Sequence, residues 1–292
     1  MIWLFASQGN KHEEALLKAM QLGCSPWEIV TVPKQAFKST VKQADGVILA
    51  GVKSDHGPTM RKLVAMGKMV MYLDKGYIRS KNLSQELMDY YRVSVNDFQP
   101  HAYMHKYQHP ADRWETLGIT PAKQAKSNNR RFILYAGSSQ KYCNFYGLGE
   151  ATEYATKVIE AAKSSDPLGR TVIYRPKPSW RGAVPIKDTV FSKYGLSMEQ
   201  ELRHTQVLIT HGSNACFEAA LHGVPSIVLG DGITKGISST SLEEVLRPQR
   251  VDTDSLLQLC YTIAYQQWSL ADFSDGSAFD YLQKVVSYLS AR

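Results

Sequence analysis

The chain has 292 residues, which is enough for two domains of ordinary size. With 43% hydrophobic and 21% charged residues, the composition excludes a disordered, collagenous or low-complexity protein. No apolar stretch approaches the ~20 residues of a membrane-spanning helix. The apolar run at the amino terminus follows no basic segment and predicts a first strand rather than a signal peptide, so we expect a cytoplasmic protein.

The net charge of +7 is concentrated in the first half of the chain. Residues 1–126 carry 17 Lys and Arg against 11 Asp and Glu, whereas residues 127–292 carry 17 against 16. Such an excess suits a polyanionic partner such as DNA, RNA or an acidic glycan, although it also occurs in proteins whose basic side chains only face solvent.

The four cysteines are far apart in the sequence and have no CxxC or histidine-rich neighbours. They are Cys24, Cys143, Cys216 and Cys260. This pattern predicts reduced, buried thiols and no metal site.

Taken in chain order, the first half alternates apolar runs with helical patterns. The strands are predicted at 2–6, 28–32, 45–50 and 69–73, and the helices at 11–22 and 58–66. Strands that alternate with helices predict a parallel sheet covered on both faces.

Residues 118–129 lose this periodicity and gain Pro, Ser, Lys and Asn, which indicates a linker. Beyond it, strands are predicted at 131–136, 171–174, 207–210 and 226–229, and helices at 149–162, 215–221, 254–268 and 277–290. We therefore expect an α/β fold of two Rossmann-like domains facing each other across a cleft. Their predicted bounds are 1–126, including the linker, and 127–292, with a C-terminal helix that could cross back to the first domain.

The most informative run is VLITHGSNACFEAALHGVPSIVLG, in which a buried strand turns into a helix. The turn contains His211 and Gly212, and the free N–H groups of the helix that follows would attract an anion. Gly212 would let a ligand approach closely, while Ser213 and Asn214 would cap the helix or donate to a phosphate. Glu218 lies one turn deeper and could accept two ribose hydroxyls. The alternative is that Ser213 and Asn214 only cap the helix and that Glu218 faces solvent.

This pattern resembles the donor-binding segment of GT-B-fold glycosyltransferases, whose carboxy-terminal domain holds the nucleotide of an activated sugar. The upstream run VIYRPKPSW is similar to the basic-Pro loop of capsule-type and teichoic-type transferases, with Lys177 where the family often has His. The resemblance implies that Arg175 and Lys177 face a diphosphate. It also implies donor contacts by Ser138 and Ser139, which stand in a Gly/Ser loop after the first strand of the second domain.

In the first domain, GVKSDHG and YLDKGY stand at the ends of predicted strands, and YYRVSVNDFQ carries Arg92 and Asn96. Together with DRWETLGI and YQQWSLADFSDGSAF, they resemble a group of GT-B-like proteins of similar length that are common in bacteriophage genomes. The resemblance implies a glycosyltransferase that uses a nucleotide-diphosphate sugar as co-substrate, with no other cofactor. The favoured acceptor is double-stranded DNA carrying a hydroxymethylated pyrimidine. An inverting reaction needs a base, and the candidates are Asp74, Asp55 and His56.

The predicted acceptor contacts are basic, aromatic and amide side chains of the first domain. They are Lys53, Lys75, Tyr77, Arg92 and Asn96, with Arg61, Lys62, Arg79, Lys81 and Tyr91 on the same expected surface. The alternatives are a transferase for a cell-surface polysaccharide or lipid-linked glycan, and a non-catalytic module that binds nucleotides or nucleic acid. The sequence leaves the oligomeric state open.

Overall fold

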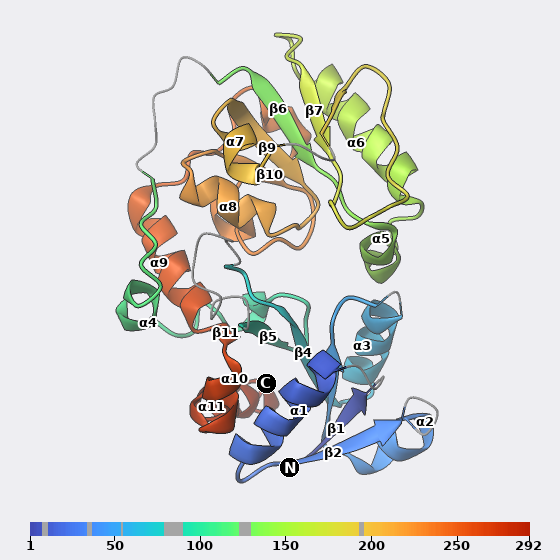
Figure 1. Cartoon of the computed structure of the whole chain (residues 1–292), viewed down its shortest axis with the longest axis vertical. Helices are drawn as coiled ribbons and strands as arrows, with labels where there is room; N and C mark the ends of the chain where they lie inside the picture. The colour runs from blue at the N-terminus through green and yellow to red at the C-terminus, as the bar shows by residue number, and fades with distance from the viewer. Residues whose placement is uncertain (8–10, 34–36, 54, 79–89, 123–129, 193–195) are drawn as a thin grey trace. The chain divides into compact units, whose positions relative to one another are not determined.

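Two sheets built mainly from parallel strands organise the chain (Figure 1). The computed structural model describes residues 1–7, 11–33, 37–53, 55–78, 90–122, 130–192 and 196–292. They divide into a first unit, Met1–His109 with Thr262–Arg292, and a second unit, Pro110–Tyr261. The chain therefore passes between the units twice, and the first passage comes before the linker expected at 118–129.

The sheet of the first unit has six strands in the order β11-β5-β4-β3-β1-β2. Their bounds are β1 Ile2–Ser7, β2 Glu28–Pro33, β3 Gly46–Ala50, β4 Met69–Lys75, β5 Tyr91–Val95 and β11 Gln267–Trp268. The first four strands pair in parallel, as predicted. Strand β5 pairs antiparallel with β4, and β11 pairs antiparallel with β5. The expectation of a purely parallel sheet is wrong at this edge, where an antiparallel strand can complete an open sheet.

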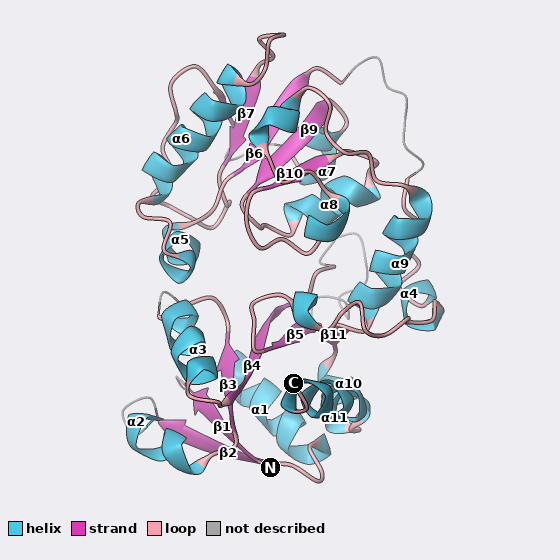
Figure 2. Cartoon of the chain, turned by 180° about the vertical axis from the view of Figure 1, so that it is seen from behind, coloured by secondary structure: helices cyan, strands magenta, loops and turns pink. Residues whose placement is uncertain are grey.

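Helices cover both faces of the first sheet, with α1, α10 and α11 on one side and α3 on the other (Figure 2). The helices and short turns are α1 Lys11–Gly23, α2 Phe37–Thr40, η1 Val41–Gln43, α3 His56–Ala65, η3 Pro100–Ala102, α10 Leu270–Ser274 and α11 Ser277–Ser290. Trp3 and Phe5 of β1 pack in one core with Met20 of α1, Phe273 of α10 and Phe279 of α11. The two ends of the chain thus build the first unit together.

The sheet of the second unit has five parallel strands in the order β10-β9-β6-β7-β8. Their bounds are β6 Phe132–Ala136, β7 Val172–Arg175, β8 Val190–Phe191, β9 Thr205–Thr210 and β10 Ser226–Val228. From β6 the chain moves outward through β7 and β8 and then returns to the other side of β6 with β9. This reversal makes β6 and β9 the topological switch point, where open α/β sheets bind ligands.

The helices of the second unit lie on both faces of its sheet, with α6 on one and α8 on the other (Figures 1 and 2). Their bounds, with those of the short turns, are α4 Asp112–Glu115, α5 Gln140–Tyr146, α6 Ala151–Ser164, α7 Met198–Leu202, α8 Ala215–Leu221, η4 Lys235–Ile237, η5 Leu242–Val245 and α9 Thr253–Ala264. The predicted helix at 254–268 ends early because Gln267 and Trp268 pair with β5. Each unit is a Rossmann-like α/β domain, which confirms the predicted α/β fold of two Rossmann-like domains.

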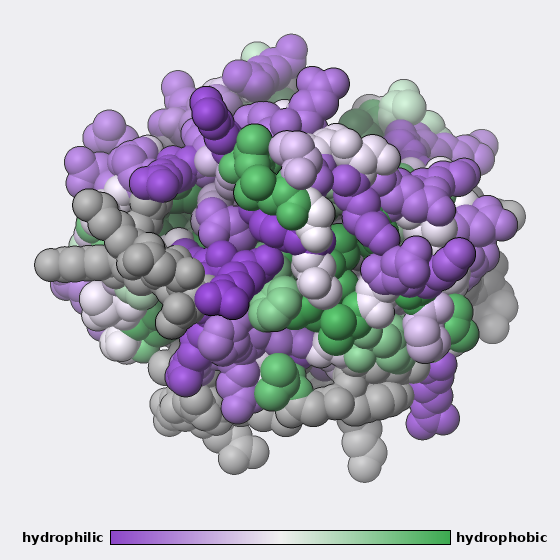
Figure 3. Space-filling view, turned by 90° about the horizontal axis from the view of Figure 1, so that it is seen from above, coloured by the Kyte–Doolittle hydropathy of each residue, from purple (hydrophilic) through white to green (hydrophobic). Residues whose placement is uncertain are grey.

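The cysteines are free and buried, as predicted. Figure 3 shows a mainly hydrophilic face, on which hydrophobic residues are exposed among polar and charged ones. Within the described part of the chain, no helix combines the length and the apolar composition that crossing a membrane requires. The same residues contain no group of His, Cys, Asp or Glu side chains that could hold a metal ion.

Candidate functional site

At the switch point of the second unit, the loop after β6 and the loop after β9 are tied together by Thr210. Its hydroxyl donates to the carbonyl of Ala136 at 3.0 Å and accepts from the N–H of Ser213 at 3.2 Å. The loop after β6 contains Ser138 and Ser139, and the loop after β9 contains the predicted anion-binding turn. Both loops therefore lie at the same edge of the sheet.

The first N–H groups of α8 already have partners. Ser213 Oγ accepts from the N–H of Ala215 at 3.3 Å, and the carbonyl of Ser213 accepts from Cys216 at 3.1 Å. The carbonyl of Asn214 accepts from Phe217, and the Asn214 side chain makes no cap hydrogen bond. The prediction of free N–H groups at the start of this helix is therefore wrong for Ala215, Cys216 and Phe217.

Gly212 does allow a close approach, but the approach is made by the protein itself. A Cβ at this position would lie 2.5 Å from the hydroxyl of Tyr142 and 2.6 Å from the carbonyl oxygen of Asp231. The predicted access of a ligand to the Gly212 backbone is therefore wrong, because α5 and the loop after β10 fill that space.

His211 is buried in a cage of tyrosines. Its Nδ1 lies 2.7 Å from the hydroxyl of Tyr154, and its ring also faces Tyr142 and Tyr146. Burial is the main cause that lowers the pKa of His211; Lys235 acts in the same direction and Asp231 opposes them. The imidazole is thus held neutral near pH 7 and offers one donor and one acceptor nitrogen.

The loop after β6 is more open. Ser138 and Ser139 are both partly exposed, and Ser139 precedes α5 without a side-chain cap hydrogen bond. The N–H of Gly137 donates to the carbonyl of Arg175 at 2.8 Å, which sets this loop beside the one that carries the exposed Lys177. Sequence reasoning missed Lys141, an exposed cation two residues after the serine pair.

Arg175 has an internal partner that the sequence did not reveal. Its Nη1 lies 2.9 Å from Oε2 of the buried Glu201 and 2.9 Å from the carbonyl of Leu196, and Glu201 also accepts from Ser192 Oγ. The Arg175 guanidinium, which was predicted to face a diphosphate, instead forms an ion pair that links β7 to α7. Glu218 is exposed on α8, so its predicted ribose contact remains a prediction.

In the first unit, Asp74 forms an ion pair with Arg92. Its Oδ2 lies 3.3 Å from Arg92 Nη2, and its Oδ1 accepts from the N–H of Lys75. Arg92 is 3% exposed and stacks on Phe98, while Tyr77 is 2% exposed. The predicted placing of Arg92 and Tyr77 on a DNA-binding surface is wrong, because both pack inside the unit.

Asn96 lies at the opposite end of the sheet from Asp74. Its Oδ1 accepts from the N–H of Val70 at 2.8 Å, and its backbone adopts a φ of 63°. The prediction that Asn96 lies beside the other acceptor contacts is wrong. Strand β5 runs antiparallel to β4, so the end of β5 that leads into Asn96 lies next to the start of β4. Lys75, Arg61 and Lys62 are exposed, Tyr91 is half-buried, and Arg79 and Lys81 lie outside the described residues.

The loop between β3 and α3 gathers the other candidates. His56 is buried, and its Nδ1 lies 2.8 Å from the carbonyl of Gly51. Since a carbonyl can only accept, Nδ1 carries the proton, and Nε2 of the neutral ring is the basic nitrogen. Lys53 Nζ lies 2.9 Å from Oε1 of Glu13, a buried carboxylate that sequence reasoning missed. Asp55 is exposed just before α3.

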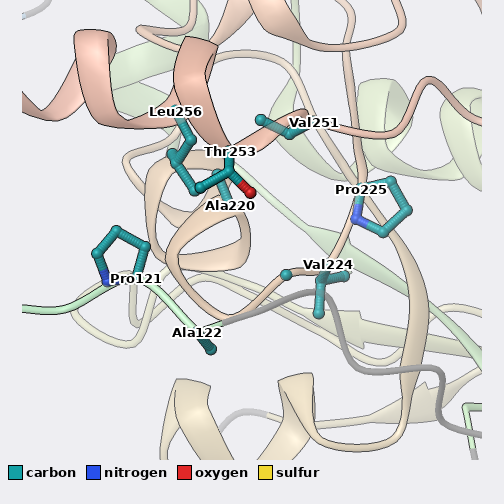
Figure 4. A pocket seen from close by; sticks show the side chains of 9 residues that line it. Pro121, Ala122, Ala220, Val224, Pro225, Val251, Thr253 and Leu256 are labelled. Atoms are coloured by element: carbon teal, nitrogen blue, oxygen red, sulfur yellow. The ribbon is translucent and has the colours of Figure 1, made fainter.

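A pocket in the second unit lies away from these groups (Figure 4). Its lining comes mainly from the end of α8, the start of α9 and the segment before β10, and includes Ala220, Val224, Pro225, Thr253 and Leu256. It adjoins the amino end of β10, opposite the carboxyl edge of the sheet, and its described lining residues are mostly apolar and include no side chain for acid–base chemistry.

No protein-family model matches this chain, and no curated protein matches it in sequence. Two solved structures from Thermosulfurimonas dismutans are similar in fold. One is the KpsC beta Kdo 2,4 transferase, at 16% identity over 92% of this chain and 91% of that chain, with a TM-score of 0.55. The other is the KpsC beta Kdo 2,7 transferase, at 11% identity over 98% of this chain and 99% of that chain, with a TM-score of 0.59. The likeness shows a GT-B-like fold of two Rossmann-like domains.

Proposed function

We propose that this chain is a glycosyltransferase that moves a sugar from a nucleotide sugar to an acceptor hydroxyl. The observation that carries the proposal is the GT-B-like fold in which both units present polar side chains at a switch point. The likeness to two Kdo transferases extends over at least 91% of each chain and supports the same class of activity.

For the donor, we favour the loop after β6 over the turn that opens α8. The hydroxyls of Ser138 and Ser139 and the ammonium of Lys177 lie at neighbouring strand ends and can hydrogen-bond to phosphate oxygens. Ser213 and Asn214 are partly exposed at the same edge and remain proposed contacts of the nucleotide.

For the base, we favour His56 over Asp74, whose two oxygens are engaged by Arg92 and Lys75. In the proposed inverting reaction, Nε2 of His56 takes the proton of the acceptor hydroxyl. The oxygen of that hydroxyl forms a bond to the anomeric carbon of the donor sugar. The bond from that carbon to the phosphate oxygen breaks, and the nucleotide leaves with the electron pair.

For the acceptor, the likeness to Kdo transferases favours a glycan. DNA with hydroxymethylated pyrimidines is the second candidate, supported by the exposed Lys75, Arg61 and Lys62. The burial of Arg92 and Tyr77 removes two of its predicted contacts.

The test is to incubate the protein with a panel of nucleotide sugars and to measure nucleotide release with and without glycan or DNA acceptors. We expect His56→Asn to lower kcat by about 10²–10⁴ and to leave donor affinity unchanged. Lys177→Met should instead weaken donor binding. A protein that binds no nucleotide sugar and releases no nucleotide would refute the proposal.

A further inference from the structure

The switch point of the first sheet lies between β1 and β3, which pair directly in parallel. From β1 the chain continues through α1 to β2 on one side, and β3 continues through α3 to β4 on the other. Glu13 stands in the first turn of α1, while Lys53 and His56 follow β3. By the rule that places ligands at such points, this is the expected binding position of the first unit.

Glu13 and Lys53 form an ion pair that is largely shielded from water. The distance is 2.9 Å, and the side chains are 9% and 22% exposed. Removing both charges from water costs free energy that the pair's attraction often fails to offset, so such a pair is weak evidence for a purely stabilising role.

The pair also changes what Lys53 can bind. An ammonium whose charge is balanced by a carboxylate at 2.9 Å attracts a DNA phosphate less than a bare ammonium does. Of its three N–H donors, one is used by Glu13, and Lys53 makes no other side-chain hydrogen bond to the described residues. The remaining donors suit neutral oxygens such as sugar hydroxyls.

The basic nitrogen of His56 belongs to the same turn. The N–H of His56 donates to the carbonyl of Lys53 at 3.1 Å, so that the ammonium and the imidazole are held by one short segment.

We propose that the β1–β3 switch point binds an uncharged sugar residue of a glycan acceptor. Lys53 donates hydrogen bonds to its hydroxyls, and Glu13 positions and neutralises Lys53. The inference rests on the proposed function for the transfer step after binding, and it selects a glycan over DNA as the partner of this site.

The test uses the full chain and two probes, an array of bacterial oligosaccharides and a short DNA duplex carrying 5-hydroxymethylcytosine. Lys53→Met and Glu13→Gln should each weaken binding of the best oligosaccharide by about tenfold or more. Glu13→Gln also unmasks the ammonium, so it should strengthen duplex binding and make it more salt-dependent, by about 0.9 in the log–log slope per phosphate gained. The matched controls are Glu14→Gln and Lys18→Met, which change exposed side chains of α1 and should leave oligosaccharide binding unchanged.

Lys53→Arg covers the case in which Lys53→Met does not fold. The arginine keeps the ion pair with Glu13, but its N–H donors point in other directions than those of the lysine. This variant should therefore weaken oligosaccharide binding while it retains the melting temperature. The proposal is overturned if the wild-type chain binds the duplex and no oligosaccharide, or if the folded Lys53 and Glu13 variants bind the oligosaccharide as the wild type does. Failure of nucleotide-sugar turnover with intact, Lys53-dependent oligosaccharide binding would contradict the proposed function and support this site.

Discussion

At the scale of single residues, Gly230 shows how tightly the second unit is packed around His211. A Cβ at Gly230 would lie 2.2 Å from Nε2 of the imidazole, whereas one at Gly236 would meet nothing within 4 Å. We expect Gly230→Ala to lower the free energy of unfolding by about 1–3 kcal/mol, because the ring would have to move within a filled cage. Gly236→Ala should change it by less than about 0.5 kcal/mol. Urea unfolding of both variants measures the difference, and equal stabilities would contradict this packing around the imidazole.

The titration of His211 gives a second prediction at this scale. Burial lowers its pKa below the ordinary value of 6.5, so the unfolded chain binds this proton more readily than the folded one. Stability should therefore fall as the pH drops through 6.5 toward the lower pKa of the folded state, and this contribution should vanish above that range. His211→Asn should flatten the pH dependence of the melting temperature, which thermal unfolding at a series of pH values measures, and an unchanged dependence would contradict the prediction.

The positions of the candidate-site loops could be predicted from the sequence, but the residues that pack around these loops could not. The turn from His211 to Asn214 follows a buried strand and precedes a helix, as its pattern indicated. That Tyr142 and Asp231 occupy the space over Gly212 depends on elements far away in the chain, and no local pattern carries that information. Glu13 was missed for the same reason, because its partner Lys53 comes from another strand end.

At the scale of elements, the ion pair between Arg175 and Glu201 links β7 to α7. The two side chains are 12% and 1% exposed, so removing the carboxylate would leave a nearly buried guanidinium uncompensated. We expect Glu201→Gln to cost about 3 kcal/mol of stability. The control is Glu199→Gln, which breaks an exposed pair with Arg203 and should cost less than about 1 kcal/mol. If denaturant unfolding gave similar losses of unfolding free energy for the two variants, burial would not make the Arg175–Glu201 pair more important for stability.

Most element types followed from apolar periodicity, and the misses have a common cause. The runs around Ile48 and Ile209 are short and continuous, as buried parallel strands should be, and both are strands. Gln267 and Trp268 continue a helical pattern, yet they form β11 because tertiary pairing with β5 outweighs local propensity. Such pairings between distant segments are what a single sequence leaves undetermined.

At the scale of the whole molecule, the two units differ in how they depend on the chain ends. The second unit is continuous from Pro110 to Tyr261, whereas the first needs residues from both ends. We expect a fragment of residues 110–261 to unfold cooperatively, and a truncation after Tyr261 to lose the first unit while keeping the second. Hydrogen exchange on the truncated chain measures this, and protection of β1 and β3 in it would contradict the expectation.

The return of the C-terminal segment also sets an order of events during synthesis. Strand β11 and helices α10 and α11 leave the ribosome after the whole second unit, although they complete the core around Trp3 and Phe5. Domains generally fold as units, so the second unit can fold before the first. The first hundred or so residues cannot complete their core until residues 262–292 have been made. Nascent Met1–His109 thus exposes its apolar face until residues 262–292 emerge, so we expect this unit to depend on a chaperone more than the second unit does.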